Sequence, residues 1–253
     1  CHYLDLDHYY KAGEDFTTVM PRKWKDAVAK YTEDTLRAYG IVPWHIEKMK
    51  LRLQKAFEEK DINRILKYSA DIGHYIGDAH VPLHTTENYN GIMTGQRGIH
   101  ALWESRLVEI NADSYDYFIG KAKYVEDVLE DAWQYVFASH YALDSVFRME
   151  LEVTRDMSPD QKYSYEQRGR VTTKVYSKDF CNEYHRRMNG MVERRLRQAV
   201  ISVGSIWYTA WVDAGQPNLN SLKGKPISSS LLKESEDLDH HHAEGKAKGR
   251  ICD

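Results

Sequence analysis

The sequence predicts an all-α fold, arranged as a single-domain multi-helix bundle. Apolar side chains recur at every third or fourth position through several long segments, which is the spacing of an amphipathic helix. Beyond the first few residues, no segment alternates apolar and polar side chains convincingly enough to indicate a strand. The chain has 253 residues, 42% of them hydrophobic, and this suffices to bury a substantial core.

Three helices are expected in the first third of the chain. The first runs from Pro21, a favoured first helical residue, to Gly40, a favoured stop. The second covers residues 44–61 and the third covers residues 62–80, each with one apolar side. Residues 9–20 read as a loop.

Longer helical segments are expected in the second half. A helix that begins near His100 runs to about Ala112, and an amphipathic segment follows at 125–155. After a polar break, a second long helical segment covers 170–212 and ends before the Gly and Pro of the AGQPNL sequence.

The chain is therefore divided into a helical domain over 1–219 and a tail over 220–253. The composition of the tail turns to Lys, Ser, Gly, Asp and Glu, which predicts a polar and loosely ordered segment. A run of histidines at 240–242 in this tail could bind metal weakly.

The strongest functional signal is a cluster of metal-ligand side chains within residues 73–104: His74, Asp78, His84, His100 and Glu104. The pairs 74/78 and 100/104 are four residues apart, so each pair shares one face of a helix. Pro82 should end the first helix and turn His84 back toward the same space. Mixed imidazole and carboxylate ligands favour Zn²⁺ over Mg²⁺ or Ca²⁺. The block therefore predicts a zinc site.

A second pair with the same spacing serves as a comparison. His140 and Asp144 are also four residues apart, in an aromatic-rich helical segment, but no third ligand is near them in the sequence. An isolated pair of this kind is usually a surface or core pair. We interpret it as structural.

The segment 2–8 collects two histidines and two aspartates, among them His2 and Asp5. Whether the segment is extended or helical, it could offer one ligand and one nearby carboxylate. A solvated acidic turn is the alternative, and these residues alone leave the two interpretations open.

The loop 85–98 between the two ligand pairs is rich in Asn, Gly and Thr, which predicts turns that rim the site. Asn88 and Asn90 could contact a substrate, although Asn in such turns usually serves the backbone. Tyr89 and Arg97 suit either a lipid or a nucleic-acid substrate.

Composition restricts the classes of protein only partly. The net charge of −3 gives no bulk attraction for nucleic acid, and no apolar run approaches the roughly 20 residues that span a bilayer. Cys1, Cys181 and Cys252 are too few and too far apart to form a disulfide framework, and they indicate neither a role nor a redox compartment. No protein partner and no oligomeric state can be inferred.

At HYIGDAHVPLH (74–84) and GIHALWE (98–104) the sequence resembles the zinc-dependent phospholipase C and single-strand-specific nuclease superfamily. HYLD at 2–5 and AGQPNL at 214–219 are similar to further elements of that family, so the resemblance covers most of 2–219. It implies an all-helical fold of that type and an extracellular or periplasmic location.

The resemblance also implies a cluster of three zinc ions. One ion would be bound by His2, His74 and Asp78, and a second by His84, His100 and Glu104. Asp78 would bridge to a third ion, and Asp5 would be the catalytic carboxylate near the attacking water. The family's further ligands, a Trp, a His and an Asp, precede the HYLD segment, and no residue precedes Cys1 here. We therefore expect two to three ions and a chain that lacks its N-terminal segment.

The function expected from the sequence is hydrolysis of phosphodiester bonds by a metal-bound hydroxide at a multinuclear zinc site. The favoured substrate is a phospholipid headgroup, as in phospholipases C. The alternative is single-stranded nucleic acid, cleaved by a nuclease or 3'-nucleotidase of the same superfamily. A second alternative is a non-catalytic, zinc-stabilised helical binding domain.

Overall fold

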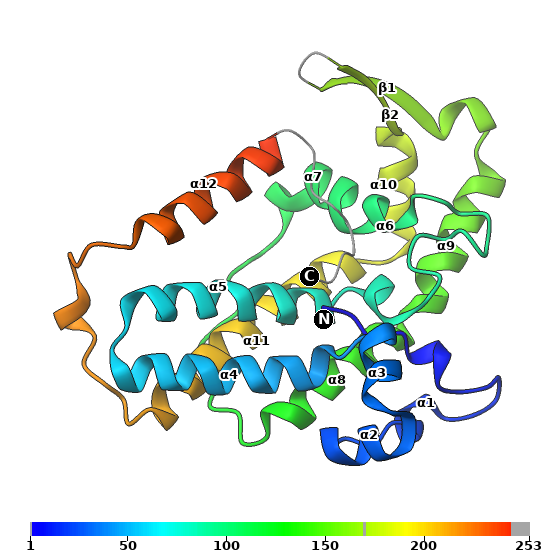
Figure 1. Cartoon of the computed structure of the whole chain (residues 1–253). Helices are drawn as coiled ribbons and strands as arrows, with labels where there is room; N and C mark the ends of the chain where they lie inside the picture. The colour runs from blue at the N-terminus through cyan, green and yellow to red at the C-terminus, as the bar shows by residue number, and fades with distance from the viewer. Residues whose placement is uncertain (1, 169–170, 244–253) are drawn as a thin grey trace.

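The computed structural model describes residues 2–168 and 171–243, and it confirms the all-α class (Figure 1). Helices make up most of the described chain, and its regular strands are the two of one short hairpin. Cys1, Cys252 and the last residues of the predicted tail lie outside the described residues. Cys181 is a buried free thiol.

Four long helices form a central bundle: α4 (Val42–Glu59), α5 (Ile62–Ala79), α8 (Val128–Tyr141) and α11 (Met191–Asp213). α4 contacts the other three, and α5 also contacts α8 and α11. Their core contains Trp44 packed edge-on against Trp133, with ring centroids 5.1 Å apart. The burial of such large rings makes this bundle a firm support for α5, which carries two of the predicted ligands.

A second group of helices packs around a core of its own, which includes Trp103, Phe180 and Tyr184. It consists of α6 (Ile99–Ala101), the π-helical turn η3 (Leu102–Arg106), α7 (Leu107–Asn111), α9 (Leu143–Asp156) and α10 (Lys178–Arg187). The short helix η2 (Pro82–Thr85) contacts α5 and α8 of the bundle and α9 of this second group. The predicted ligands therefore lie at the junction of the two cores.

Short elements complete the described chain: η1 (Leu6–His8), α1 (Phe16–Val19), α2 (Trp24–Tyr31), α3 (Glu33–Tyr39), η4 (Ala112–Ser114), η5 (Pro159–Gln161) and η6 (Asn220–Leu222). The single helix predicted over 21–40 is thus two helices. Thr32 turns the chain at a φ of 67°, and its hydroxyl accepts a hydrogen bond from the Thr35 N–H, which caps α3. The predicted loop over 9–20 contains one helical turn.

The helix predicted to begin at residue 170 is wrong at its start, because residues 163–168 and 171–176 form the two strands of an antiparallel hairpin. β1 (Tyr163–Arg168) pairs with β2 (Val171–Tyr176), with Tyr163 opposite Tyr176 (Figure 1). β2 reads VTTKVY, and β-branched residues favour a pleated strand over a helix.

Both long helical segments of the second half are also interrupted. The segment predicted over 125–155 breaks at Ala142, between α8 and α9. The segment predicted over 170–212 breaks at Gly190, whose φ of 71° suits a residue without a Cβ. An apolar period that continues across a turn conceals these breaks, since both helices of each pair present apolar faces.

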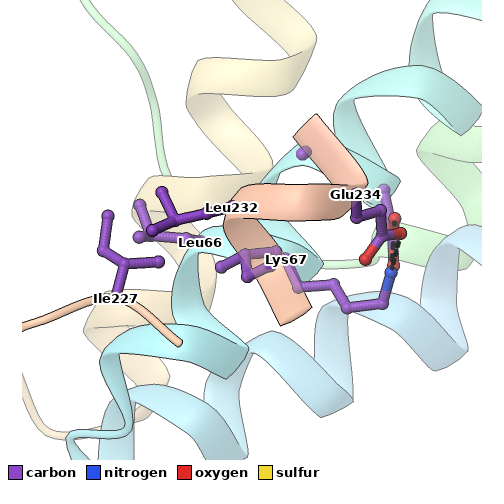
Figure 2. A pocket seen from close by; sticks show the side chains of 8 residues that line it. Leu66, Lys67, Ile227, Leu232 and Glu234 are labelled. Carbon is purple, nitrogen blue, oxygen red and sulfur yellow. Dashed lines mark hydrogen bonds and ion pairs between the residues drawn. The ribbon is translucent and has the colours of Figure 1, made fainter. Parts of the chain in front are cut away.

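Part of the polar segment after 219 is helical, since it contains α12 (Ser229–Ala243). Lys67 of α5 pairs with Glu234 at 2.6 Å, and Leu66 faces Leu232 across a largely apolar groove of about 280 Å³ (Figure 2). The side chains at 240–242 lie outside what the structure describes. Across the described residues, no helix combines the length and apolar character needed to cross a bilayer.

Candidate metal centre

The C-terminal half of α5 presents the first ligand pair. Nε2 of His74 lies 3.2 Å from Oδ2 of Asp78, one helical turn away. The helix ends at Ala79, where Arg195 donates to the His80 carbonyl at 2.8 Å and Ser139 donates to the Ala79 carbonyl at 2.6 Å. These donors satisfy carbonyls that a helix end leaves open, and they hold this end of α5 in place.

The turn after α5 brings two more histidines to the same place. Val81 is extended before Pro82, and η2 then carries His84 back toward α5. The N–H of Leu4 donates to the His84 carbonyl at 3.0 Å, which fastens the start of the chain beside η2. As a result, Nδ1 of His2 lies 2.9 Å from Oδ2 of Asp78.

The second ligand pair lies on an irregular helix, whereas the sequence predicted a regular one. Gly98 begins it at a φ of 96°, and the stretch Leu102–Arg106, which includes Glu104, is a π-helical turn. π-bulges inside helices are frequent at functional sites. Nε2 of His100 lies 2.6 Å from Oε2 of Glu104 and 3.2 Å from Nε2 of His84, and the Glu104 oxygen lies 3.4 Å from the same His84 atom.

Two groups of side chains among the described residues could each hold a metal ion: His2, Asp78 and His84, and His84, His100 and Glu104. Within each group the ligand atoms lie within 4.8 Å of one another. His84 belongs to both, so the two groups adjoin. His74 lies outside both groups with a side chain 59% exposed, although its ring stacks on that of His2 at 5.6 Å. This differs from the resemblance, which placed His74 with His2 and Asp78.

The donor atoms fit zinc. With bonds of about 2.05 Å, a tetrahedral zinc ion holds its ligand atoms about 3.3 Å apart. The 3.2 Å and 3.4 Å separations of His84 from its two partners match, and the shorter His100–Glu104 contact is that of a hydrogen bond. Nε2 of His2 and Nδ1 of His84 are buried without a hydrogen-bond partner in the described chain, while Oδ2 of Asp78 contacts the rings of His2 and His74. Buried polar atoms normally have partners, so the two ring nitrogens fit a ligand.

Glu104 is charged in this environment. Burial opposes the ionised carboxylate, but hydrogen bonds from His100 and His84 outweigh it and hold the pKa of Glu104 well below its usual range. The carboxylate is therefore available as an anionic ligand at neutral pH.

The structure buries Asp5, the predicted catalytic carboxylate, just before η1, and its N–H donates to the Tyr39 carbonyl at 2.8 Å. Asp5 is a member of neither ligand group. After burial itself, its charge is the largest cause that raises the pKa of Tyr9 above the usual value. Its catalytic role stays a prediction.

Asn88 and Asn90 of the loop 85–98 both form hydrogen bonds to the backbone of the loop. Oδ1 of Asn88 accepts from the Met93 N–H at 2.9 Å, and Oδ1 of Asn90 accepts from the Gly98 N–H at 3.0 Å. This is the backbone role that the sequence left open, so substrate contact by the two asparagines stays a prediction. Tyr89 lies at the site itself, with its ring edge-on to His100 at 5.7 Å.

Two anchors of this loop were missed. Asp7 accepts hydrogen bonds from the Thr86 hydroxyl at 2.5 Å and from the Glu87 N–H at 3.1 Å. At the other end, Gln96 donates to Glu150 at 2.6 Å. The sequence places Asp7 in the acidic segment 2–8, but nothing in it singles out Glu150 from the other charged residues of its helix.

His140 and Asp144 are structural, as interpreted, but they do not act as a pair. Nδ1–H of His140 donates to the Thr85 carbonyl at 3.0 Å, so its Nε2 accepts from the Tyr10 hydroxyl at 2.7 Å. The helix break at Ala142 separates it from Asp144, which pairs with Arg148 instead. His140 thus supports η2 from behind.

Comparison of the chain with protein-family models, with curated proteins and with solved structures finds no match. The family resemblance therefore rests on the motif residues alone.

Proposed function

We propose that this chain is a zinc-dependent hydrolase of phosphodiester bonds that cleaves phospholipid headgroups, as phospholipases C do. One observation carries the proposal: two adjoining groups of candidate ligands share His84, and a buried ring nitrogen of His2 and one of His84 have no hydrogen-bond partner in the described chain. Single metal sites that only stabilise a fold have closed sets of four protein ligands, whereas each group here supplies three.

His84, His100 and Glu104 would hold one ion, and His2, Asp78 and His84 are the residues available for a neighbouring one. When bound, zinc supplies positive charge that lowers the pKa of water and stabilises the negative charge of the phosphodiester transition state. The charged Glu104 and the half-buried Tyr89 form one side of the site. Asp5 is the proposed general base, which would orient or deprotonate the attacking water.

A phospholipid is favoured over nucleic acid by the tip of the loop 85–98. Ile92 and Met93 there are 65% and 71% exposed, and neighbouring exposed apolar side chains beside a site suit contact with a lipid surface. A single-strand nuclease would stack bases on an aromatic ring, and Tyr89 could provide one. The test therefore includes single-stranded DNA as a substrate. The proposed location, outside the cell or in the periplasm, agrees with a lipid substrate but rests on the resemblance.

The test is a paired assay of the full chain, zinc-loaded and chelator-treated, on phosphatidylcholine vesicles and on single-stranded DNA. We expect release of phosphocholine from the vesicles, and its loss with chelator. His84→Ala should lower both the zinc content and the turnover, since His84 belongs to both ligand groups. His185→Gln is the matched control, because His185 forms a hydrogen bond with Tyr115 and belongs to neither group of candidate ligands.

Turnover that survives complete zinc removal, or a purified protein with no zinc by elemental analysis, would refute the proposal. Cleavage of DNA alone would favour the nuclease. Stoichiometric zinc without hydrolysis of either substrate would favour the zinc-stabilised binding domain.

A further inference from the structure

A second pocket lies on the helix that carries His100 and Glu104, on a different face. It encloses about 430 Å³ between this helix and β2 of the hairpin. Ala101 and Ser105 line it, and each directly follows one of the ligands. Successive helical residues point about 100° apart, so the pocket opens beside the metal centre and not into it. A volume of this size lies in the usual range of small-molecule sites, about 300–1,000 Å³.

The charges that line this pocket do not balance. Arg106 is paired with two carboxylates, since Glu109, which also lines the pocket, accepts from it at 3.1 Å and Glu166 forms a second ion pair with it. Arg97 and Lys174 also line the pocket, and within the described residues no carboxylate pairs with either. With both glutamates counted, the group carries one net positive charge. The Lys174 ammonium lies over the Tyr163 ring, 4.1 Å from its centroid.

The remaining walls provide a hydrogen-bond donor and apolar contact. The exposed Ser105 hydroxyl has no partner in the described part of the chain. Leu102, Val175 and the ring of Tyr176 form the inner wall. The Tyr176 hydroxyl donates to the Arg97 carbonyl at 3.4 Å, which joins β2 to the start of the helix and closes that end of the pocket.

We propose that this pocket binds an organic phosphate monoester. Such a group carries a charge of about −1.5 to −2 at neutral pH, and Arg97 and Lys174 attract it because no carboxylate of the described residues pairs with either. Its oxygens accept from Arg97, Lys174 and Ser105, and Arg in particular forms paired hydrogen bonds to phosphate. The organic part occupies the space along Leu102 and Tyr176, which a phosphate ion alone does not fill. This inference stands apart from the proposed zinc chemistry, because none of the lining residues belongs to a ligand group.

The experiment titrates the full chain with glycerol 3-phosphate and, separately, with inorganic phosphate, by calorimetry. We expect saturable binding of the ester that weakens as salt is raised, because the contacts are charged. The double variant Arg97→Gln/Lys174→Met should weaken ester binding about tenfold or more, because it removes both charged donors. Lys178→Met is the matched control, because Lys178 is exposed just beyond the hairpin and does not line the pocket.

A metal-centre variant separates this pocket from the zinc site. Ester binding should persist in His84→Ala and in chelator-treated protein, with folding checked by circular dichroism. Binding lost with the metal would assign the phosphate to the metal centre and overturn the proposal. An unchanged dissociation constant in the double variant would overturn it too, as would equal affinity for inorganic phosphate, which would leave no role for the organic part.

Discussion

The ion pair that anchors the site loop is deeply buried, and its removal should be costly. Glu150 is fully buried, and Nζ of Lys162 lies 2.7 Å from its carboxylate. The Lys162 side chain is only 16% exposed. Lys162→Met leaves the carboxylate with only its neutral partners, Gln96 and Thr154. Breaking a buried pair by removing one partner costs about 3–5 kcal/mol, and the remaining hydrogen bonds place the expected loss near 4 kcal/mol.

For a chain of this length, a loss of about 4 kcal/mol lowers the melting temperature by about 8 °C. The assay is urea unfolding of chelator-treated protein, followed by far-UV circular dichroism, so that metal binding does not contribute to the free energy of unfolding. The matched control is Lys55→Met, which removes a lysine that is 61% exposed from a surface pair with Glu59 and should change the stability by less than about 1 kcal/mol.

A second substitution distinguishes the ion pair from simple loss of packing. Glu150→Gln in the Lys162→Met background removes the uncompensated charge and should restore about half of the lost stability. A double variant as unstable as Lys162→Met alone would refute the reasoning. So would a loss below about 1 kcal/mol for the single variant, which would mean that water reaches the carboxylate.

Two further predictions concern the loop and the histidine behind it. Gly91→Ala should lower the free energy of unfolding in urea by about 2 kcal/mol or more, because at a φ of 70° a Cβ would overlap the carbonyl oxygen of Gln96. Gly95 is the control: its φ is 73° but the space around it is open, so Gly95→Ala should cost about 1 kcal/mol. Equal losses in the two variants would contradict the overlap. Burial lowers the pKa of His140 from 6.5, so the unfolded chain takes up that proton first as the pH falls. The stability advantage of wild type over His140→Gln should therefore shrink from pH 7 to pH 5, and a constant difference would show that the pKa is not lowered.

The sequence predicted best where the decisive information is local. The predicted helices at 44–61 and 62–80 are close to the observed α4 and α5, because their apolar period is strong and Asp61 caps α5 through the N–H groups of Asn63 and Arg64. The four-residue spacings likewise place Asp78 beside His74 and Glu104 beside His100.

The sequence failed where a segment takes its structure from distant parts of the chain. The strands at 163–168 and 171–176 were missed because they lie next to long helical patterns, although the β-branched residues of the second strand were visible in the sequence. Polar composition concealed α12, whose ion pair to Lys67 spans 167 positions of sequence. The sequence also did not show the break at Ala142, because apolar residues recur with a helical period on both sides of it and do not indicate where one helix ends and the next begins.

Residue order and spacing alone therefore predicted a helical chain with two pairs of candidate metal ligands, since a helix sets which side chains share a face. Tertiary packing decided that the pairs meet at His84, that His74 stays outside both groups, and that Asp7 and Glu150 hold the loop between them. Those contacts join residues that are far apart in the sequence, 80 positions in the case of Asp7 and Glu87. They exist only after the chain has folded, so no local periodicity carries them.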